Sequence, residues 1–132
     1  MNDLCEILKN SKTIAVVGIS SNPMRTSRNI ADYLVRNGYN VVGVNPNRNF
    51  MDADGIKVYN SLREIPHKID IVNVFRRSED IPEIITDVNE IMPKVLWLQL
   101  GIRNDNAVQS CIENGITVVQ DSCIKVEHSY CS

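Results

Sequence analysis

The stretch Thr13-Ile14-Ala15-Val16-Val17-Gly18-Ile19-Ser20 decides the fold. It is a short apolar run, rich in β-branched residues, that stops at a glycine. Residues 27–37 then carry apolar side chains at helical spacing, and Asn37-Gly38 ends that segment as a helix C-terminus would. Residues 40–44 form a second apolar run. This strand–helix–strand order indicates parallel strands that are covered by helices on both faces.

The rest of the chain continues the alternation. We expect further strands at 69–75, 94–98 and 116–119, helices at 3–9, 81–91 and 104–114, and a marginal strand at 57–59. The sequence therefore predicts one Rossmann-like α/β domain over 1–132. Its doubly wound parallel sheet lies in a three-layer α/β/α arrangement, with a core at 13–120 and a C-terminal tail at 121–132. A real marginal strand gives the strand order 3-2-1-4-5-6, and its absence gives a flavodoxin-like order.

Composition limits the classes of function. The chain has 132 residues, 43% of them apolar, with 16 acidic against 14 basic side chains and a net charge of −2. These values are typical of a globular protein and give no reason to expect nucleic acid as a partner. No apolar run approaches the roughly 20 residues of a membrane helix, and we find no secretory signal. The four cysteines, at 5, 111, 123 and 131, form no C-x-x-C pair, so we expect reduced thiols and a cytoplasmic protein.

Ligands of doubly wound sheets bind beyond the carboxyl ends of the strands, where the strand order reverses. The segments that follow the predicted strands converge on that edge, and they are unusually basic for an acidic protein. Their cations are Arg25, Arg48, Arg76, Arg77, Arg103 and Lys125. We therefore expect an anionic ligand that carries phosphate, held near a helix N-terminus.

The first of these segments is the most informative. Gly18 allows the backbone to approach a phosphate, Ser20 and Ser27 offer hydroxyl groups, and Arg25 adds positive charge. A serine at position 27 is equally well explained as a simple helix N-cap.

Two nucleotide-binding fingerprints are missing. After Gly18 there is no G-x-G-x-x-G, and Asn45-Pro46 occupies the place of the acidic residue that binds the ribose of NAD. Arg48 follows, and a cation there suits a phosphate on the ribose. The Walker A pattern is also absent. These absences argue against NAD and against phosphoryl transfer, and they leave NADP open.

Five short motifs occur in order along the chain: Gly18-x-Ser20-x-x-Pro23-x-Arg25-x-Ser27, Val44-Asn45-Pro46-Asn47, Phe75-Arg76-Arg77-Ser78-Glu79-Asp80, Trp97-x-Gln99-x-Gly101, and Asp121-x-Cys123-Ile124-Lys125-x-Glu127-His128. Together they resemble the small stand-alone coenzyme A-binding proteins, which are similar to the coenzyme A-binding domain of the succinyl-CoA synthetase α subunit. The resemblance covers about residues 13–129. It extends to the binding half of the synthetase only, so catalysis does not carry over.

The resemblance implies where coenzyme A would lie. The loop at 18–27 would hold the pyrophosphate, and Arg48 would bind the 3′-phosphate. Asn45, Pro46, Phe75 and Arg76 would flank the adenosine and the pantetheine. The other candidate ligand-binding residues at this edge are Ile19, Gln99, Gly101, Cys123 and Lys125.

Three functional interpretations follow. The first is a protein that binds coenzyme A or an acyl-CoA as a non-catalytic sensor, carrier or regulatory module. The second is a regulatory domain for NADP or another nucleotide. The third is a small enzyme that acts on acyl-CoA through Cys123, whose thiol we expect near the reactive end of the cofactor and able to form a mixed disulfide with it. Cys123, His128 and Cys131 lack a fourth ligand, so we expect no metal site. A second copy of the chain or another protein as partner is left open.

Overall fold

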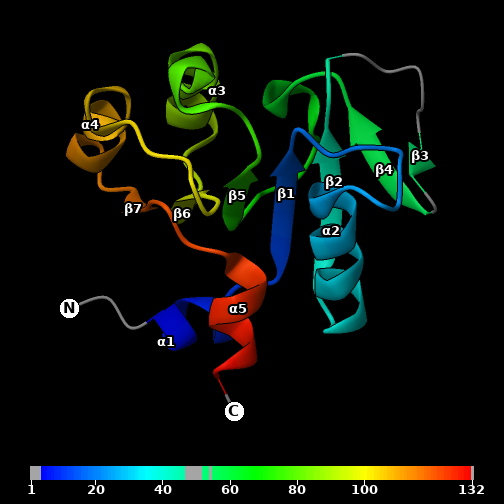
Figure 1. Cartoon of the computed structure of the whole chain (residues 1–132). Coiled ribbons are helices and arrows are strands. Elements are labelled where there is room, and N and C mark those ends of the chain that lie inside the picture. Colours follow the sequence, from blue (N-terminus) through cyan, green and yellow to red (C-terminus); the bar gives the residue numbers. More distant parts are fainter. Residues whose placement is uncertain (1–3, 47–51, 54, 132) are drawn as a thin grey trace.

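The computed structural model describes residues 4–46, 52–53 and 55–131. Their elements follow one another as α1 (Leu4–Lys9), β1 (Thr13–Val17), α2 (Thr26–Arg36), β2 (Asn40–Val44), β3 (Asp52–Ala53), β4 (Ile56–Tyr59), η1 (Leu62–Glu64), β5 (Ile71–Val74), η2 (Ser78–Asp80), α3 (Pro82–Ile91), β6 (Val95–Leu98), α4 (Asp105–Glu113), β7 (Thr117–Val119) and α5 (Ile124–Ser129). Figure 1 shows their arrangement.

The strands of the described residues form one sheet in the order β3-β4-β2-β1-β5-β6-β7. All neighbouring pairs from β4 to β7 are parallel, and β3 adds an antiparallel edge against β4. The marginal strand at 57–59 is therefore real, and the parallel part has the predicted order 3-2-1-4-5-6. The Rossmann-like α/β prediction is confirmed. The sequence analysis missed β3, because a two-residue strand carries no periodicity.

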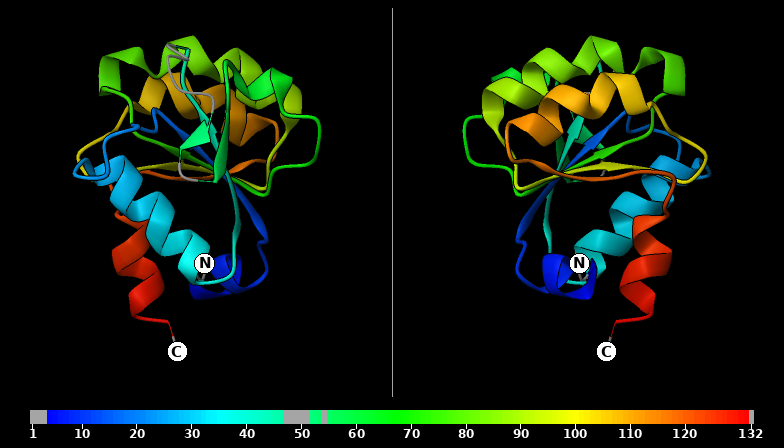
Figure 2. Two further views of the ribbon diagram at one scale, coloured as in Figure 1. Left: turned by 90° about the vertical axis from the view of Figure 1, so that its right-hand side faces the viewer. Right: turned by 90° about the vertical axis from the view of Figure 1, so that its left-hand side faces the viewer.

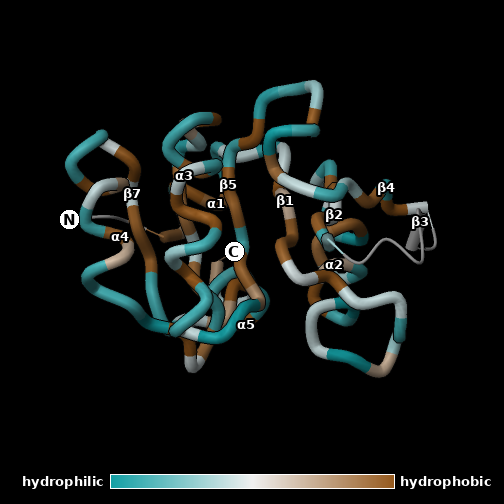
Figure 3. The backbone as a smooth tube through the Cα atoms, turned by 90° about the horizontal axis from the view of Figure 1, so that it is seen from above, coloured by the Kyte–Doolittle hydropathy of each residue, from teal (hydrophilic) through white to brown (hydrophobic). Residues whose placement is uncertain are grey.

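Helices cover both faces of the sheet, as Figure 2 shows. Alternate residues of β1 point in opposite directions: Ala15 and Val17 pack in a core with residues of α3 and α4, whereas Ile14 and Val16 pack in a second core with residues of α1, α2 and α5. Residues of the strands are buried on both sides, which explains their continuous apolar sequence. In Figure 3 the hydrophobic colour follows the strands, and hydrophilic colour dominates many connecting loops.

The tail at 121–132 contains α5, which the sequence analysis did not predict as a helix. Its first residue, Ile124, is fully buried in the second core. After its last turn, Cys131 forms a disulfide with Cys5 at the start of α1. The expectation that all four cysteines are thiols is wrong for this pair. The sequence separation of 126 residues hid it, because spacing along the chain says nothing about two segments that the fold brings together.

Asp70 joins the amino ends of two central strands. Its Oδ2 accepts hydrogen bonds from the N–H groups of Lys12 (2.8 Å) and Thr13 (3.1 Å), and Lys94 Nζ lies 3.6 Å from its Oδ1. Burial by itself disfavours the charged carboxylate, but the two hydrogen bonds and the positive charge of Lys94 outweigh it. The pKa of Asp70 is therefore lowered.

Neither α2 nor α3 begins with a serine cap. Helix α2 begins at Thr26 with Arg25 as its N-cap residue, so Ser27 lies inside the first turn and is not the cap. Ser78 begins the 3-10 turn η2, and α3 starts at Pro82. Ser78 Oγ instead accepts a hydrogen bond from the N–H of Arg103. Among the described residues no helix has the length and apolar character needed to cross a membrane.

Candidate functional site

Gly18 allows the chain to turn where β1 ends. Its φ is +89°, and a Cβ placed on it would lie 2.5 Å from the carbonyl oxygen of Phe75. Its N–H donates to the carbonyl of Val44 at 2.8 Å. Since a side chain would meet both strain and a clash, only glycine fits between the ends of the two neighbouring strands.

The loop between β1 and α2 is held by its own hydrogen bonds. The N–H of Ser20 donates to Ser27 Oγ at 3.1 Å, and Ser20 Oγ accepts from the N–H of Asn22 at 3.0 Å. Asn22 Oδ1 accepts in turn from the N–H of Met24 at 3.0 Å. These bonds fix the approach to the first turn of α2, whose N–H groups have no acceptor within the helix. Arg25 is exposed at the start of that turn.

The end of β2 lies beside this loop. Asn45 Nδ2 donates to the carbonyl oxygen of Ile19 at 2.8 Å, so Asn45 supports the loop backbone. The Ile19 side chain is fully buried in the core, and only its backbone faces this junction. Pro46 is exposed. Arg48, the residue predicted to bind a ribose phosphate, lies outside the described residues.

A cavity of about 650 Å³ opens beyond the ends of β5 and β6, beside the starts of α2 and α5; we call it the carboxyl-edge cavity. Its walls contain five of the predicted binding residues: Phe75, Arg76, Gln99, Gly101 and Cys123. The other lining residues are Thr26, Arg77, Ser78, Glu79, Leu100 and Ile102. The cavity lies next to the reversal of strand order between β1 and β5, and ligands of this topology bind at that reversal.

A buried amide, that of Gln99, contributes to the wall of the cavity. Gln99 is 4% exposed, and its Oε1 lies 3.3 Å from Asn73 Nδ2 and 3.4 Å from the backbone nitrogen of Ile124. Both nitrogens donate to it. These contacts join β5, the end of β6 and the first turn of α5, so the wall that carries Cys123 is tied to the sheet.

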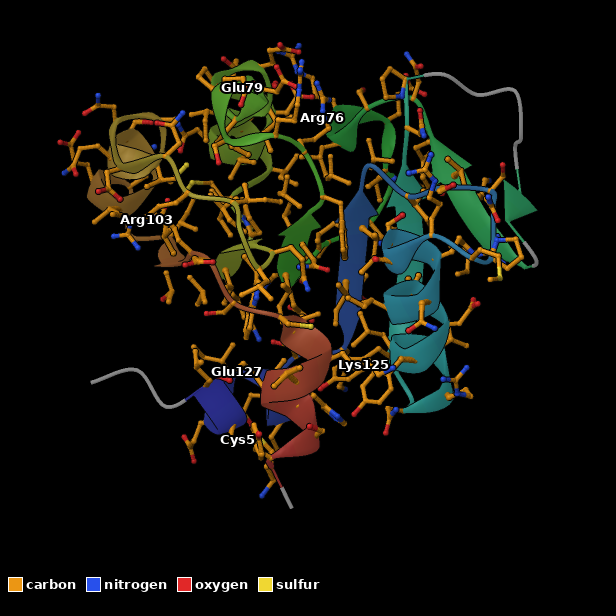
Figure 4. The ribbon with its side chains drawn as sticks, viewed as in Figure 1. Cys5, Arg76, Glu79, Arg103, Lys125 and Glu127 are labelled. Carbon is orange, nitrogen blue, oxygen red and sulfur yellow. A yellow bond between two sulfur atoms is a disulfide. The ribbon has the colours of Figure 1, made fainter. Side chains whose placement is uncertain are left out.

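The cations at this edge are mostly paired. Arg76 Nη2 lies 3.2 Å from Glu83 and 3.8 Å from Asp80, and Arg77 Nε lies 3.0 Å from Asp80. The hydrogen bond to Asp80, the charge of Asp80 and then that of Glu79 raise the pKa of Arg77. Figure 4 shows Arg76 and Glu79 beside α3. The edge is therefore less positive than its cations alone suggest.

Lys125 points away from this cavity. Its Nζ donates to Asn29 Oδ1 at 3.2 Å and lies 5.3 Å from the centre of the Tyr33 ring. Figure 4 shows Lys125 between α5 and α2. In this structure it joins two helices. Arg103 pairs with Asp105 at 3.1 Å and does not line the cavity either.

The two free thiols have different surroundings. Cys111, a residue of α4, is fully buried, and desolvation raises the pKa of its thiol, which stays protonated and unreactive. Cys123 is half-buried and lines the carboxyl-edge cavity. Cys131 is bonded to Cys5, so it cannot act as the thiolate ligand considered with Cys123 and His128.

Sequence reasoning missed several residues of the site. Thr26 lines the cavity from the first turn of α2, and Arg28 lies two residues further on with only 2% of its surface exposed. The signal was visible: the run Arg25-Thr26-Ser27-Arg28 places two cations and no acid at a helix start, against the helix dipole.

Comparisons with known proteins agree with this geometry. Residues 12–129 match the family model described as CoA binding domain. A Bacillus subtilis protein, uncharacterized protein YneT, is 45% identical over 96% of this chain and 93% of its own length. The α subunit of acetate–CoA ligase (ADP-forming) I from Pyrococcus furiosus is 28% identical over 82% of this chain, which spans only 26% of that subunit.

A solved structure has the same fold. A hypothetical protein from Pyrococcus horikoshii superposes with a TM-score of 0.91 at 34% identity, covering 97% of this chain and 89% of that one. Since the family model spans nearly the whole of the described fold, the chain belongs to the CoA binding domain family.

Proposed function

We propose that this protein binds coenzyme A, or an acyl derivative of it, in the carboxyl-edge cavity, and that it serves as a sensor, carrier or regulatory module. The observation that carries the proposal is the position of that cavity. It lies at the carboxyl ends of β5 and β6, next to the reversal of strand order, and Thr26 and Cys123 line it from the starts of α2 and α5. Its volume, about 650 Å³, is within the range of about 300–1,000 Å³ that small-molecule sites have.

The lining suits the two chemical halves of such a ligand. Phe75, Leu100 and Ile102 supply apolar surface for the pantetheine arm, and Gln99 supplies an amide for its polar groups. We assign Thr26, in the first turn of α2, and Arg76 to the phosphates. Arg48 remains our candidate for the 3′-phosphate of the ribose.

Titration calorimetry with coenzyme A, 3′-dephospho-coenzyme A and NADP tests the proposal. We expect coenzyme A to bind more tightly than NADP. Arg48→Ala should weaken the binding of coenzyme A by roughly tenfold or more, because a charge-assisted bond is lost. The affinity for 3′-dephospho-coenzyme A should stay almost unchanged. Arg36→Ala, at the opposite end of α2, is the matched control. Binding of NADP in preference to coenzyme A would overturn the proposal in favour of a nucleotide-binding regulatory domain.

We further propose that Cys123 exchanges with the disulfide form of coenzyme A. The Cys123 thiolate would attack one sulfur, a bond between the protein and one coenzyme A would form, and the second coenzyme A would leave as a thiolate. Intact-mass analysis should then find one coenzyme A on the wild type and none on Cys123→Ser. An adduct that persists in Cys123→Ser excludes this site. Turnover of an acyl-CoA thioester that disappears in Cys123→Ser would instead favour an enzyme.

A further inference from the structure

Arg28 occupies an unusual position in the first turn of α2. It is the third residue of the helix and is only 2% exposed, although it carries a full positive charge. The N-cap residue, Arg25, is also a cation, and the first turn contains no acid. A helix start in a soluble domain ordinarily carries acids, because the N-terminus is the positive end of the helix dipole.

Placing a cation there is unfavourable for folding in two ways. Burial removes the guanidinium from water, and the helix dipole repels its charge. Asp32 offsets part of this charge: its Oδ1 lies 3.7 Å from Arg28 Nε, one turn along the helix. Asp32 is 36% exposed, so solvent screens part of its effect. Locally unfavourable choices of this kind are expected where function requires them.

The side chain also reaches the loop that precedes the helix. Arg28 Nη1 donates a hydrogen bond of 3.0 Å to the carbonyl oxygen of Ser21. That carbonyl lies in the middle of the β1–α2 loop, between the Ser20 and Asn22 contacts that shape it. Arg28 thus anchors the loop through the Ser21 carbonyl and places a buried positive charge next to the loop backbone.

We infer that Arg28 is a positioning residue for the phosphate groups of the ligand. It holds the β1–α2 loop in the shape that receives them, and its charge, with the first turn of α2, makes this place attractive to an anion. Asp32 reduces that attraction. The inference deepens the proposed function and rests on it.

Three variants separate this role from a purely structural one. Asp32→Asn removes one opposing charge from a partly exposed position. We therefore expect coenzyme A to bind about two- to fivefold more tightly, with a smaller gain at high salt. Arg28→Gln should weaken the binding of coenzyme A by about tenfold or more, and Arg28→Lys should recover part of that lost affinity. Pantetheine, which has no phosphate, should bind each of the three variants with the affinity that it has for the wild type.

Glu113→Gln is the matched control for Asp32→Asn. It makes the same change of charge at the last residue of α4, at the opposite edge of the sheet, and should leave the affinity for coenzyme A unchanged. If Asp32→Asn binds coenzyme A no more tightly than the wild type, the inference is wrong, even if Arg28→Gln unfolds. An equal loss of pantetheine and coenzyme A in Arg28→Gln would also overturn it. A wild type that binds no coenzyme A would instead overturn the proposed function.

Discussion

Reducing the Cys5–Cys131 disulfide should cost this protein much of its stability. The bond closes a loop of 126 residues, almost the whole described chain. A cross-link of that span restricts the unfolded chain, and the chain-entropy relation gives about 16 cal/mol/K, or about 5 kcal/mol at 25 °C. Domains of this size have a total free energy of unfolding of about 5–15 kcal/mol, so the loss is a third of it or more.

Urea denaturation followed by circular dichroism measures this difference. With a slope of about 2 kcal/mol per M, the midpoint should fall by about 2.5 M when a reductant is added to the oxidised protein. Cys131→Ser should have the low midpoint with and without the reductant, which separates the disulfide from any effect on Cys111 and Cys123. The reasoning would be refuted if reduction of the wild type lowered its free energy of unfolding by less than about 1 kcal/mol. Four titratable thiols in the protein before reduction would also refute it.

Three further substitutions, one of them with a control, test contacts at the site and elsewhere in the fold. Gly18→Ala should destabilise the protein by about 2–3 kcal/mol and abolish ligand binding, since the new Cβ would meet the Phe75 carbonyl at 2.5 Å. Gly38→Ala, with a similar φ of +90° and open space around it, should cost only about 1 kcal/mol in the same urea assay. Asp70→Asn should lower the free energy of unfolding by about 1–2 kcal/mol at pH 7. Because the pKa of Asp70 is lowered, the advantage of the wild type is complete above the ordinary aspartate pKa of about 4 and disappears as the pH falls through the lowered value, which urea titrations at several pH values would reveal. Asn104→Ala removes the side-chain cap on the N–H of Ala107 and should lower the urea midpoint by an amount worth about 1 kcal/mol.

The main elements of the fold could be predicted because their signals are local. The apolar run at 13–17 and the helical spacing after residue 26 belong to contiguous segments, and right-handed connection then fixes the order of the strands. The disulfide and α5 could not be predicted in this way. Cys5 and Cys131 meet only because α1 and α5 cover the same face of the sheet, and that depends on the whole topology.

The candidate site shows the same difference between features with a local sequence signal and features that depend on the tertiary structure. Phe75, Gln99 and Cys123 line the cavity at that edge, and each follows a strand in the sequence. Lys125 follows one too, yet its side chain turns towards Asn29 and Tyr33, since the direction of a helical side chain depends on the neighbours against which its helix packs. The pairing of Arg76 with Glu83 likewise depends on how α3 leaves the edge, and no spacing rule predicts it.

The chain has one tryptophan, and its surroundings make it a natural optical probe. Trp97 is fully buried in β6, and its indole N–H donates to the carbonyl of Ser122 at 2.8 Å, one residue before the thiol that lines the cavity. Its fluorescence should be at short wavelengths in the folded protein and should shift to the red on unfolding. Movement of the turn at Ser122 when the cavity fills would change the intensity without that shift. Occupancy and unfolding could then be followed separately in one unlabelled sample.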